Sequence, residues 1–445
     1  MNINLPDDVK FIIDTLESGG FEAYAVGGCV RDSLLGKSPQ DWDICTPALP
    51  EQTMKCFNGQ HIIETGLQHG TITLMLNHKP FEITTYRVDG KYKDNRRPEK
   101  VRFVNVLKRD LARRDFTINA MAYNPQTGLA DYYGGQQDLS ERKIKCVGNA
   151  DKRFQEDALR IMRALRFASV FGFTIDDDTA KAMHENKKLL NNISAERIAA
   201  ELNKLIVGDS AKQTLLGHTD ILTEIIPEFI PAVGFNQKRP EHCYNVFEHS
   251  LHSLSEAPKD IIIRLAVLFH DIGKPATYTD ENGLGRYFNH FKVGAEITEI
   301  ILKRLRYDND TIKAVTELVR LHDSGILLEA KYIKRWLNKI GEERFRQLLE
   351  VKKADIKGLA GHIIPRALSN INKVEQILAE VTTEQQCFSL KDLVVNGRDL
   401  IAAGVPEGAK IGVILNKLMD MVIDDESAND KAALLEIAEL YAKEL

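Results

Sequence analysis

The pattern of apolar residues changes near residue 150, and this change most restricts what the chain can fold into. Before it, short runs rich in β-branched and aromatic residues end at glycine or proline, which predicts a small sheet. After it, apolar residues recur at steps of three and four, which predicts helices. We therefore expect an α/β head and a long helical body. The expected strands are 24–26, 42–44, 70–76 and 81–86, the helices 157–170, 194–207, 261–269, 296–305 and 413–423, and the breaks 231–241, 279–285 and 404–408.

Length and charge limit the classes of protein that the chain can be. Its 445 residues correspond to about three domains. With 43% hydrophobic and 28% charged residues, it is neither collagen-like nor wholly disordered. The 59 basic and 64 acidic residues leave a net charge of −5, so no overall basic coat exists. Any binding of nucleic acid must then depend on local patches.

The cysteines and the apolar runs indicate a cytoplasmic protein. No two of the six cysteines have the C-x-x-C spacing of a zinc or thioredoxin motif, and a disulfide framework is not expected at this length. The N-terminus lacks a basic segment followed by an apolar one, and no apolar run reaches 18 residues. We expect neither secretion nor a membrane span.

Gly27 and Gly28 lie between a predicted strand and a helix-like run that ends at Gly36. Adjacent glycines allow a tight turn and a close backbone approach, and a helix N-terminus offers free N–H groups to an anion. Arg31 lies close by for phosphate. Taken alone, the pair is equally consistent with an ordinary strand-to-helix turn.

The next segment points to a metal. Asp41 and Asp43 flank Trp42 in a predicted strand, so their carboxylates share one face. Two such carboxylates repel unless a cation lies between them, and oxygen ligands suit Mg²⁺. Glu82, between Phe81 and Ile83, is the candidate third carboxylate, although it could equally be a salt-bridge residue. These three residues are our candidates for metal-assisted activation of a 3′-hydroxyl.

Between Arg87 and Asp115 lie eleven basic and five acidic residues. The polar stretch from Tyr92 to Pro98 predicts a mobile loop whose positive charge can contact phosphates. It is followed by Arg113 and Arg114, which can grip triphosphate oxygens, and by Asp115, which can accept from ribose hydroxyls. A salt-bridge cluster at a helix start is the alternative.

These motifs, in this order, resemble the class II tRNA nucleotidyltransferase and bacterial poly(A) polymerase family. The glycine turn with Arg31, the D-x-D strand and the run R-R-D-F-T-I-N-A are similar to its first motifs. Later segments resemble its third, fourth and fifth motifs: Asp131–Leu139, Glu156–Phe167 and Ser194–Glu201. The resemblance covers about the first 210 residues closely.

The resemblance implies an α+β fold: a polymerase-β-like nucleotidyltransferase head with a small mixed sheet, then an all-α neck, a body with an HD module, and a tail. We expect the head at 1–148, the neck at 149–235, the HD module at 236–330 and the tRNA-binding tail at 331–445. The implied partners are tRNA, CTP and ATP, without DNA or membrane, and the implied cofactor is Mg²⁺. By resemblance, Asn396–Ile401 and Gly404–Leu415 belong to the tail that grips the tRNA.

The fourth motif offers a way to select bases without a template. On a helix, Asp157 and Arg160 are neighbours at positions i and i+3. A carboxylate accepts from an exocyclic amino group and a guanidinium donates to an unprotonated ring nitrogen, so C and A satisfy both whereas U and G satisfy neither. The alternative is a surface salt bridge. Arg163 continues this face, while Arg166, rotated by about 180° from Asp157, is assigned to phosphate or to structure.

A second cluster of histidines and aspartates lies in the helical region. His270 and Asp271 follow an apolar helix and precede Ile272-Gly273-Lys274-Pro275, which resembles an HD-type metal-dependent phosphohydrolase module. Imidazoles with a carboxylate suit Ni²⁺, Mn²⁺, Co²⁺ or Mg²⁺. The resemblance gives the ligand candidates and the residues that line the site: His249, His270, Asp271 and Asp323, with His290 and His322 beside them. Such a module can hydrolyse phosphomonoesters or 2′,3′-cyclic phosphates, or can be a scaffold.

The leading hypothesis is therefore the addition of C, C and A to the 3′ end of tRNA, with a possible phosphohydrolase activity. A poly(A) polymerase shares the head motifs and is the nearest alternative. A member that adds only CC or only A, and an RNA-binding HD phosphohydrolase whose head has lost transfer activity, are further alternatives.

Overall fold

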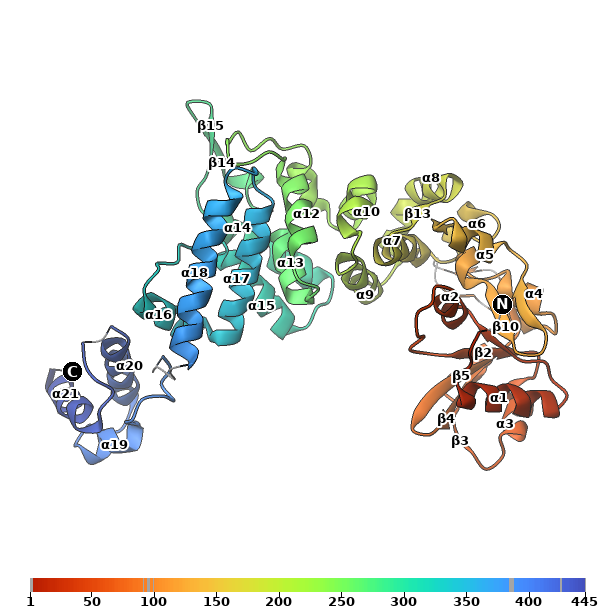
Figure 1. Cartoon of the computed structure of the whole chain (residues 1–445), viewed down its shortest axis with the longest axis horizontal. Helices are drawn as coiled ribbons and strands as arrows, with labels where there is room; N and C mark the ends of the chain where they lie inside the picture. The colour runs from red at the N-terminus through yellow and green to blue at the C-terminus, as the bar shows by residue number, and fades with distance from the viewer. Residues whose placement is uncertain are drawn as a thin grey trace. The chain divides into compact units, whose positions relative to one another are not determined.

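The computed structural model describes residues 3–90, 92–93, 97–98, 100–383, 388–424 and 426–444. The chain forms two compact units, residues 1–227 and 228–445 (Figure 1). The division into head, neck, HD module and tail is finer than these two units and stays a prediction. No helix in the described ranges is long and apolar enough to cross a membrane.

A seven-stranded sheet forms the centre of the first unit, in the order β11-β10-β1-β2-β5-β4-β3. Only β2 and β5 run parallel among these neighbours, so the sheet is mixed, as the fold class predicted. Its strands are β1 (Tyr24–Val26), β2 (Asp43–Thr46), β3 (His61–Ile63), β4 (Thr71–Leu76), β5 (Lys79–Thr85), β10 (Met121–Asn124) and β11 (Gly128–Asp131). Short pairs join the remaining strands: β6 (Arg87–Asp89) with β9 (Val101–Phe103), β7 (Tyr92–Lys93) with β8 (Arg97–Pro98), and β12 (Lys143–Ile144) with β13 (Thr174–Ile175).

The parallel pair brings the predicted acids to one end of the sheet. Asp43 lies opposite Glu82 in the register of β2 and β5. Trp42 is buried while Asp41 and Asp43 are exposed, so the two carboxylates share one face, although the strand itself begins only at Asp43. The apolar side chains of the central strands pack into a buried cluster beneath them.

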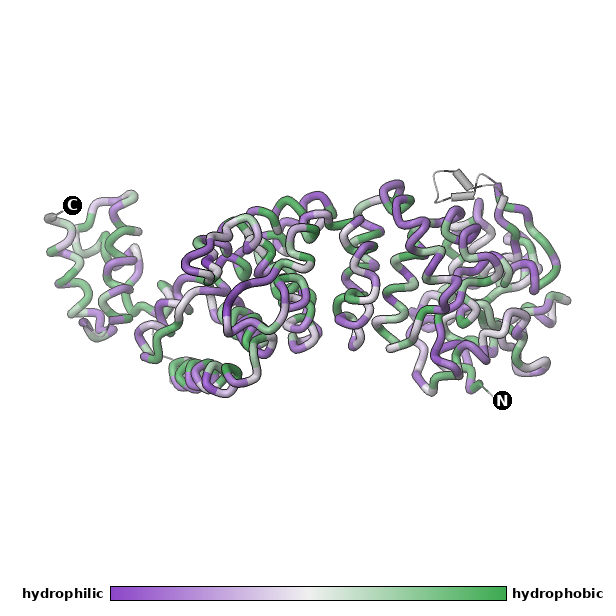
Figure 2. The backbone as a smooth tube through the Cα atoms, turned by 90° about the horizontal axis from the view of Figure 1, so that it is seen from above, coloured by the Kyte–Doolittle hydropathy of each residue, from purple (hydrophilic) through white to green (hydrophobic). Residues whose placement is uncertain are grey.

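The helices of the first unit are amphipathic, and Figure 2 shows hydrophilic and hydrophobic residues alternating along them. In α9 the buried residues include Ile198, Leu202 and Leu205, at steps of three and four. The helices are α1 (Asp7–Ser18), α2 (Gly28–Leu34), α3 (Pro50–Cys56), α4 (Leu107–Leu111), α5 (Gly135–Ser140), α6 (Ala150–Glu156), α7 (Leu159–Phe171), α8 (Asp177–Asn186), α9 (Ala195–Ile206), α10 (Ala211–Gly217) and α11 (Thr219–Ile225).

The structure differs from the sequence prediction at Asp157. We expected Asp157 inside a helix with Arg160, but α6 ends at Glu156 and Asp157 has extended backbone (φ −139°, ψ 103°). Its carboxylate accepts a hydrogen bond from the backbone N–H of Leu159 at 3.1 Å, where α7 begins. A short aspartate side chain competes for backbone donors in this way, which favours a helix boundary over a helix interior.

The second unit is helical, with one hairpin among its described residues. Helices α12, α13, α14, α15 and α17 pack against one another. Asn245, Asp260 and Asp308 accept from backbone N–H groups at the starts of α12, α13 and α15 and so fix where these helices begin. The helices are α12 (Val246–Glu256), α13 (Ile261–Phe269), α14 (His290–Arg304), α15 (Asn309–Leu321), α16 (Ala330–Ile340), α17 (Glu342–Lys357), α18 (Ile364–Thr383), α19 (Gly397–Ala402), α20 (Ala409–Ile423) and α21 (Lys431–Glu444).

The break expected at 279–285 is a β-hairpin of β14 (Tyr278–Glu281) and β15 (Leu284–Tyr287). Its turn residues Asn282 and Gly283 both have positive φ, at 56° and 82°. Asn-Gly is the dipeptide that such a tight hairpin turn prefers, so the signal was in the sequence and the prediction of a plain break was wrong.

Helices α19, α20 and α21 enclose an apolar cluster of their own. This segment holds the residues that we assigned to the tail by resemblance. Asp425, in the acidic run 424–426 of the sequence, lies outside the described residues.

Candidate active site and metal centre

A cavity of about 540 Å³ in the first unit collects most of the predicted nucleotide-site residues. It brings together the glycine turn, the D-x-D strand, the R-R-D motif and one face of α7. Its charged lining consists of Arg31, Asp32, Lys37, Asp41, Asp43, Arg114, Asp115, Arg163 and Arg166, with Phe167 and Phe171 between them. The mixture of cationic side chains and carboxylates suits a polyanion bound together with a cation.

The glycine turn allows an arginine to approach the backbone. Gly27 has φ +83°, and a Cβ at this position would come within 2.7 Å of Arg114 Nη1. Gly28, which begins α2, lines the cavity. The turn therefore favours glycine for its positive φ, and the absence of a Cβ leaves room for the Arg114 guanidinium beside the backbone.

Arg31 is held in a fixed orientation at the cavity wall. Its guanidinium donates to Asn119 Oδ1 at 2.6 Å and to Asp32 Oδ1 at 2.9 Å, and it lies over the rings of Phe167 and Phe171. Our sequence reasoning did not identify Asn119 or the two phenylalanines as supports of this arginine. Asn119 belongs to the R-R-D-F-T-I-N-A run, which was the available signal.

The carboxylates of Asp41 and Asp43 lie in the cavity without a protein partner among the described residues. Burial raises the pKa of Asp43, Arg114 opposes this, and the neighbouring charges of Glu82 and Asp41 raise it further. A divalent cation would remove this repulsion, which agrees with the chemistry of the donors. Glu82 is exposed and lies opposite Asp43 in the sheet, but it does not line the cavity.

Asp115 and Arg163 form a close ion pair on another side of the cavity. Arg163 Nε donates to Asp115 Oδ2 at 2.8 Å, and Asn119 donates to Oδ1 at 3.1 Å. Burial alone would raise the pKa of Asp115, but Arg163 and these hydrogen bonds hold it well below its usual value. We therefore expect Asp115 to be ionised and to contribute a negative charge to this side of the cavity.

Arg166 also lines the cavity. It lies over the ring of Phe167 at 4.1 Å, and its Nε is 3.2 Å from Glu201 Oε2. The assignment of Arg166 to phosphate or to structure stays a prediction, and Glu201, in the fifth motif, is the buried acid that orients it.

Asp157 and Arg160 do not line the cavity in this structure. Asp157 Oδ2 pairs with Arg197 at 3.0 Å, while Arg160 donates to Glu156 Oε2 at 2.9 Å and to the carbonyl oxygen of Arg113. Both nevertheless act on the Asp115–Arg163 pair, since the charge of Arg160 lowers the pKa of Asp115 and the charge of Asp157 raises the pKa of Arg163.

The basic stretch from Tyr92 to Pro98 contains the paired strands β7 and β8, where we expected a loop. Residues 94–96, and the side chains of 91–99, lie outside the described residues.

Four histidines of the second unit converge on one point. His249 lies on α12, His270 follows α13, His290 begins α14, and His322 follows α15. All four are buried. The helix ends therefore bring together residues that are up to 73 positions apart in the sequence.

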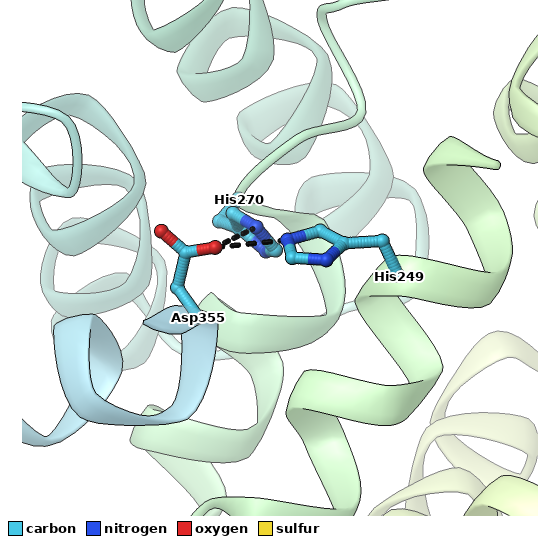
Figure 3. A group of neighbouring side chains, drawn as sticks. All are labelled: His249, His270 and Asp355. Carbon is cyan, nitrogen blue, oxygen red and sulfur yellow. Dashed lines mark hydrogen bonds and ion pairs between the residues drawn. The ribbon is translucent and has the colours of Figure 1, made fainter. Parts of the chain in front are cut away.

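Two groups of side chains in this cluster could each hold a metal ion. The first is His249, His270 and Asp355, and the second is Asp271, His290 and His322. In Figure 3 both imidazoles of the first group point toward the Asp355 carboxylate. Asp355 Oδ1 is 2.8 Å from His249 Nε2 and 3.5 Å from His270 Nε2.

Asp355, rather than Asp323, completes this cluster. Asp323 is exposed and belongs to neither group, whereas Asp355 reaches the histidines from α17. The resemblance to an HD-type module had given Asp323 as the ligand candidate. Asp355 lies more than 30 residues away with no pattern around it, so only the packing of α17 against α12 and α13 identifies it.

The cluster combines carboxylates with side chains that carry positive charge. Burial by itself lowers the pKa of His270, but Asp271 and Asp355 outweigh burial and raise it to about 10. Lys274 Nζ lies 2.6 Å from Asp271 Oδ2 and also donates to Gln237 Oε1 at 2.8 Å. Lys274 and His270 thus both lie beside the buried Asp271 carboxylate, and His270 also lies beside the partly exposed Asp355.

Comparison with known proteins identifies the family. The chain matches the Poly A polymerase head domain over residues 23–145, the "probable RNA and SrmB-binding site of polymerase A" over 172–233, and "tRNA nucleotidyltransferase domain 2 putative" over 288–438. It is 32% identical to the CCA-adding enzyme of Levilactobacillus brevis over 97% of this chain and 98% of that one. The chain belongs to the CCA-adding enzyme family. This confirms the resemblance that the ordered motifs indicated.

Further CCA-adding enzymes are similar to this chain in sequence and in structure. The CCA-adding enzyme of Oceanobacillus iheyensis is 33% identical over 96% of this chain and 95% of that protein. The solved structure of the Bacillus stearothermophilus CCA-adding enzyme in complex with CTP has a TM-score of 0.70 and 28% identity, and covers 98% of this chain and 97% of that one. The Thermotoga maritima CCA-adding enzyme complexed with tRNA has a TM-score of 0.60 at 19% identity, over 98% of this chain and 96% of that chain, which shows the shared fold.

Proposed function

We propose that this protein adds C, C and A to the 3′ end of tRNA, using CTP and ATP, by metal-dependent nucleotidyl transfer. The observation that carries the proposal is the cavity that combines Asp41 and Asp43 with four arginines in a member of this family. The five free cysteines that the structure describes agree with a reducing cytoplasm as its location.

In the proposed reaction, the 3′-hydroxyl of the RNA loses its proton to solvent, and its oxygen forms a bond to the α-phosphorus of the nucleotide. The bond between that phosphorus and the bridging oxygen breaks, and pyrophosphate leaves. Mg²⁺ bound by Asp41 and Asp43, with Glu82 beside them, would supply activation of the hydroxyl and neutralisation of the leaving group. The protein's own contribution is mainly orientation and electrostatics.

The arginines position the triphosphate in this proposal. Arg31 and Arg114 lie beside the glycine turn and its helix start, so they meet the phosphates together with backbone N–H groups. Arg163 and Arg166 extend the cationic wall, and Asp115 accepts from the ribose. The sugar and phosphates are thus held by side chains that are already fixed by ion pairs.

Base selection is assigned to Asp157 and Arg160. In this structure Asp157 pairs with Arg197, and Arg160 pairs with Glu156. To meet a base they must exchange these ion pairs for contacts with its amino group and ring nitrogen. Such an exchange favours C and A over U and G, because U and G leave both side chains unpaired.

The decisive experiment combines the purified protein, Mg²⁺ and a tRNA transcript that lacks its CCA end with each nucleotide singly and with all four together. We expect two additions with CTP alone and a complete end with CTP and ATP. Extension of many RNAs with ATP alone would favour a poly(A) polymerase, and arrest after CC a partial enzyme. Calorimetry that gave UTP and GTP the affinity of CTP and ATP would refute base selection.

A second candidate function is favoured by the histidine cluster. We infer that it binds a divalent metal and hydrolyses phosphate esters, such as phosphomonoesters or 2′,3′-cyclic phosphates at RNA ends. The donors support this: four buried imidazoles and two carboxylates converge, which is the ligand chemistry of Mn²⁺, Co²⁺ or Ni²⁺. Release of phosphate, or opening of a cyclic phosphate on an RNA end, after addition of each metal to chelator-treated protein tests it.

A further inference from the structure

We propose that Lys37 is a further ligand of the triphosphate and that Phe171 positions it. The proposal rests on the nucleotidyl transfer proposed above and adds two residues to its phosphate site. Lys37 follows the end of α2, Phe171 is the last residue of α7, and both line the cavity that holds the D-x-D carboxylates.

The charge of Lys37 is not balanced by a carboxylate. Each of the four arginines that line the cavity has one nearby: Arg31 has Asp32 at 2.8 Å, Arg114 has Asp110 at 4.0 Å, Arg163 has Asp115 at 2.5 Å, and Arg166 has Glu201 at 3.2 Å. Within the described ranges, Lys37 forms no ion pair. Its charge is therefore available to an anion, and a triphosphate is the anion that the proposed reaction brings to this cavity.

A hydrogen-bonded turn fixes the backbone of Lys37, although its side chain is exposed. Gly36 has φ +71° and donates its backbone N–H to the carbonyl oxygen of Ser33 at 3.1 Å. The backbone N–H of Lys37 donates to the carbonyl oxygen of Asp32 at 2.9 Å. These two bonds around a glycine of positive φ form the Schellman motif that ends many helices. The lysine is thus anchored where the chain leaves α2 for the cavity wall.

The ring of Phe171 holds the ammonium group. Lys37 Nζ lies over this ring at 5.0 Å from its centroid, and the guanidinium carbon of Arg31 lies over the same ring at 4.8 Å. The face of an aromatic ring attracts cations but carries no net charge, so it does not neutralise them as a carboxylate would. The three N–H donors of the ammonium group and its full charge therefore remain for phosphate oxygens.

The position of Phe171 is itself fixed by other rings. It stacks on Phe167, one turn earlier in α7, with centroids 5.7 Å apart and an interplanar angle of 6°, and it contacts Phe173 at 5.6 Å. Phe167 is buried and packs edge-on against Phe116 at 5.8 Å. Because the ring already orients the lysine, the long side chain loses less conformational freedom when it binds phosphate.

The neighbouring arginine indicates which phosphate Lys37 meets. Arg31 donates to Asp32 and Asn119 through three of its five N–H groups, which leaves two for the triphosphate to which we assign it. Lys37 and Arg31 place two positive charges over one ring, and these charges repel unless an anion lies beside them. Phosphate oxygens held by Arg31 are therefore within the same charged region as Lys37, whereas the RNA backbone is the alternative source of phosphate.

The test compares Lys37→Met, which keeps a long apolar side chain over the ring, with Lys37→Arg, which keeps the charge. We expect Lys37→Met to raise the KM for CTP and to weaken pyrophosphate binding by about 10-fold, with little change in kcat, because one contact to the phosphates is lost. Lys37→Arg should restore most of the affinity. Lys55→Met, at an exposed lysine of α3 outside the cavity, is the matched control and should change neither value.

Phe171→Leu tests the positioning role. It should raise the KM for CTP by about 2- to 5-fold, the value of a cation–ring contact, and Phe171→Tyr should restore it because the ring is kept. In the Lys37→Met background the effect of Phe171→Leu should be smaller, since no ammonium group is left to hold. An equal effect in both backgrounds, or no recovery in Phe171→Tyr, would overturn the positioning role.

Calorimetry with pyrophosphate and without RNA separates this proposal from the proposed function. Unchanged pyrophosphate affinity in Lys37→Met would overturn the assignment, and a raised KM for tRNA in that variant would then give Lys37 to the RNA backbone. If the unsubstituted protein bound pyrophosphate through Lys37 but did not add C, C and A, the proposed function would fail and the phosphate ligand would stand. Lys37 is exposed, so its substitution should leave the free energy of unfolding unchanged, which denaturant unfolding checks.

Discussion

The cavity of the first unit and the histidine cluster of the second unit both concentrate charged side chains, but they differ in how these side chains are paired and buried. In the cavity, arginines already neutralise Asp32 and Asp115, and only Asp41 and Asp43 lack partners among the described side chains. In the cluster, the four histidines and Asp271 are buried, Asp355 is partly exposed, and Lys274 faces Asp271. The cavity therefore suits a substrate that brings its own charge, whereas the cluster gathers imidazoles and carboxylates that could hold a metal ion.

The largest expected effect comes from separating the two sites. Asp41→Ala should lower nucleotide addition by at least about 10³-fold, because it removes a ligand of the cation that activates the 3′-hydroxyl. Hydrolysis of phosphate esters should be unchanged. Incorporation of labelled CTP into truncated tRNA and release of phosphate measure the two activities.

The exposed Asp14 on α1 provides the control, and Asp14→Ala should leave both activities as they are. Survival of addition in Asp41→Ala would show that the metal assignment in the first unit is wrong.

Two substitutions test which aspartate, Asp355 or Asp323, is a metal ligand of the cluster. Asp355→Asn should weaken metal binding and hydrolysis by at least about 100-fold, because its carboxylate contacts two of the histidines. Asp323→Asn should have little effect, because Asp323 is exposed and belongs to neither group. Metal content and phosphate release of the two variants give the comparison, and a reversed order would restore Asp323 as the ligand.

Substitutions at the residues proposed to select the base should have a smaller effect, on the preference among nucleotides. Asp157→Ala and Arg160→Ala should each lower the preference for CTP and ATP over UTP and GTP by about 5- to 150-fold, the value of one unpaired buried contact. Single-nucleotide incorporation with each of the four triphosphates measures the ratio.

Asp177→Ala, at an exposed position of α8, is the control. An equal loss of rate for all four nucleotides would mean that the two residues act only through their ion pairs with Arg197 and Glu156.

The smallest expected effect concerns stability and pH in the second unit. Burial, Lys274 and His249 lower the pKa of His242 to about 3, although Asp271 and Asp355 oppose this. Between pH of about 6.5 and 3 the unfolded chain takes up a proton that the folded chain does not, so the free energy of unfolding falls as pH falls. His242→Gln should reduce this dependence.

Denaturant unfolding of the metal-free protein at pH 7 and pH 5 measures the difference. His362→Gln, at an exposed position, should behave as the unsubstituted protein. An unchanged slope in His242→Gln would mean that other groups carry the dependence.

Local patterns predicted much of the fold. The strand 24–26 and the helix 261–269 coincide with β1 and α13, because their residues combine strong local preference with clear ends. The prediction failed at Asp157, where a side chain bonds to the backbone, and at Asn282-Gly283, where turn chemistry outweighed the appearance of a break.

Local patterns also predicted much of the site in the first unit. Six of the eight predicted nucleotide-binding residues line one cavity, because their motifs lie on short, ordered elements around the sheet. The supports Asn119, Phe167 and Glu201 were missed, because nothing in their spacing distinguishes a residue that orients an arginine from one that only packs.

The sequence by itself determined the mixed head, the helical body, the family and the chemical types gathered at each site. These follow from periodicity and from short motifs, which act over a few neighbouring residues. Only the tertiary structure decided that Asp355 joins His249 and His270, that Asp271 faces two pairs of histidines, and that Asp157 and Arg160 pair with Arg197 and Glu156 instead of lining the cavity. Contacts between distant segments depend on how helices pack, and no local pattern in the chain records that choice.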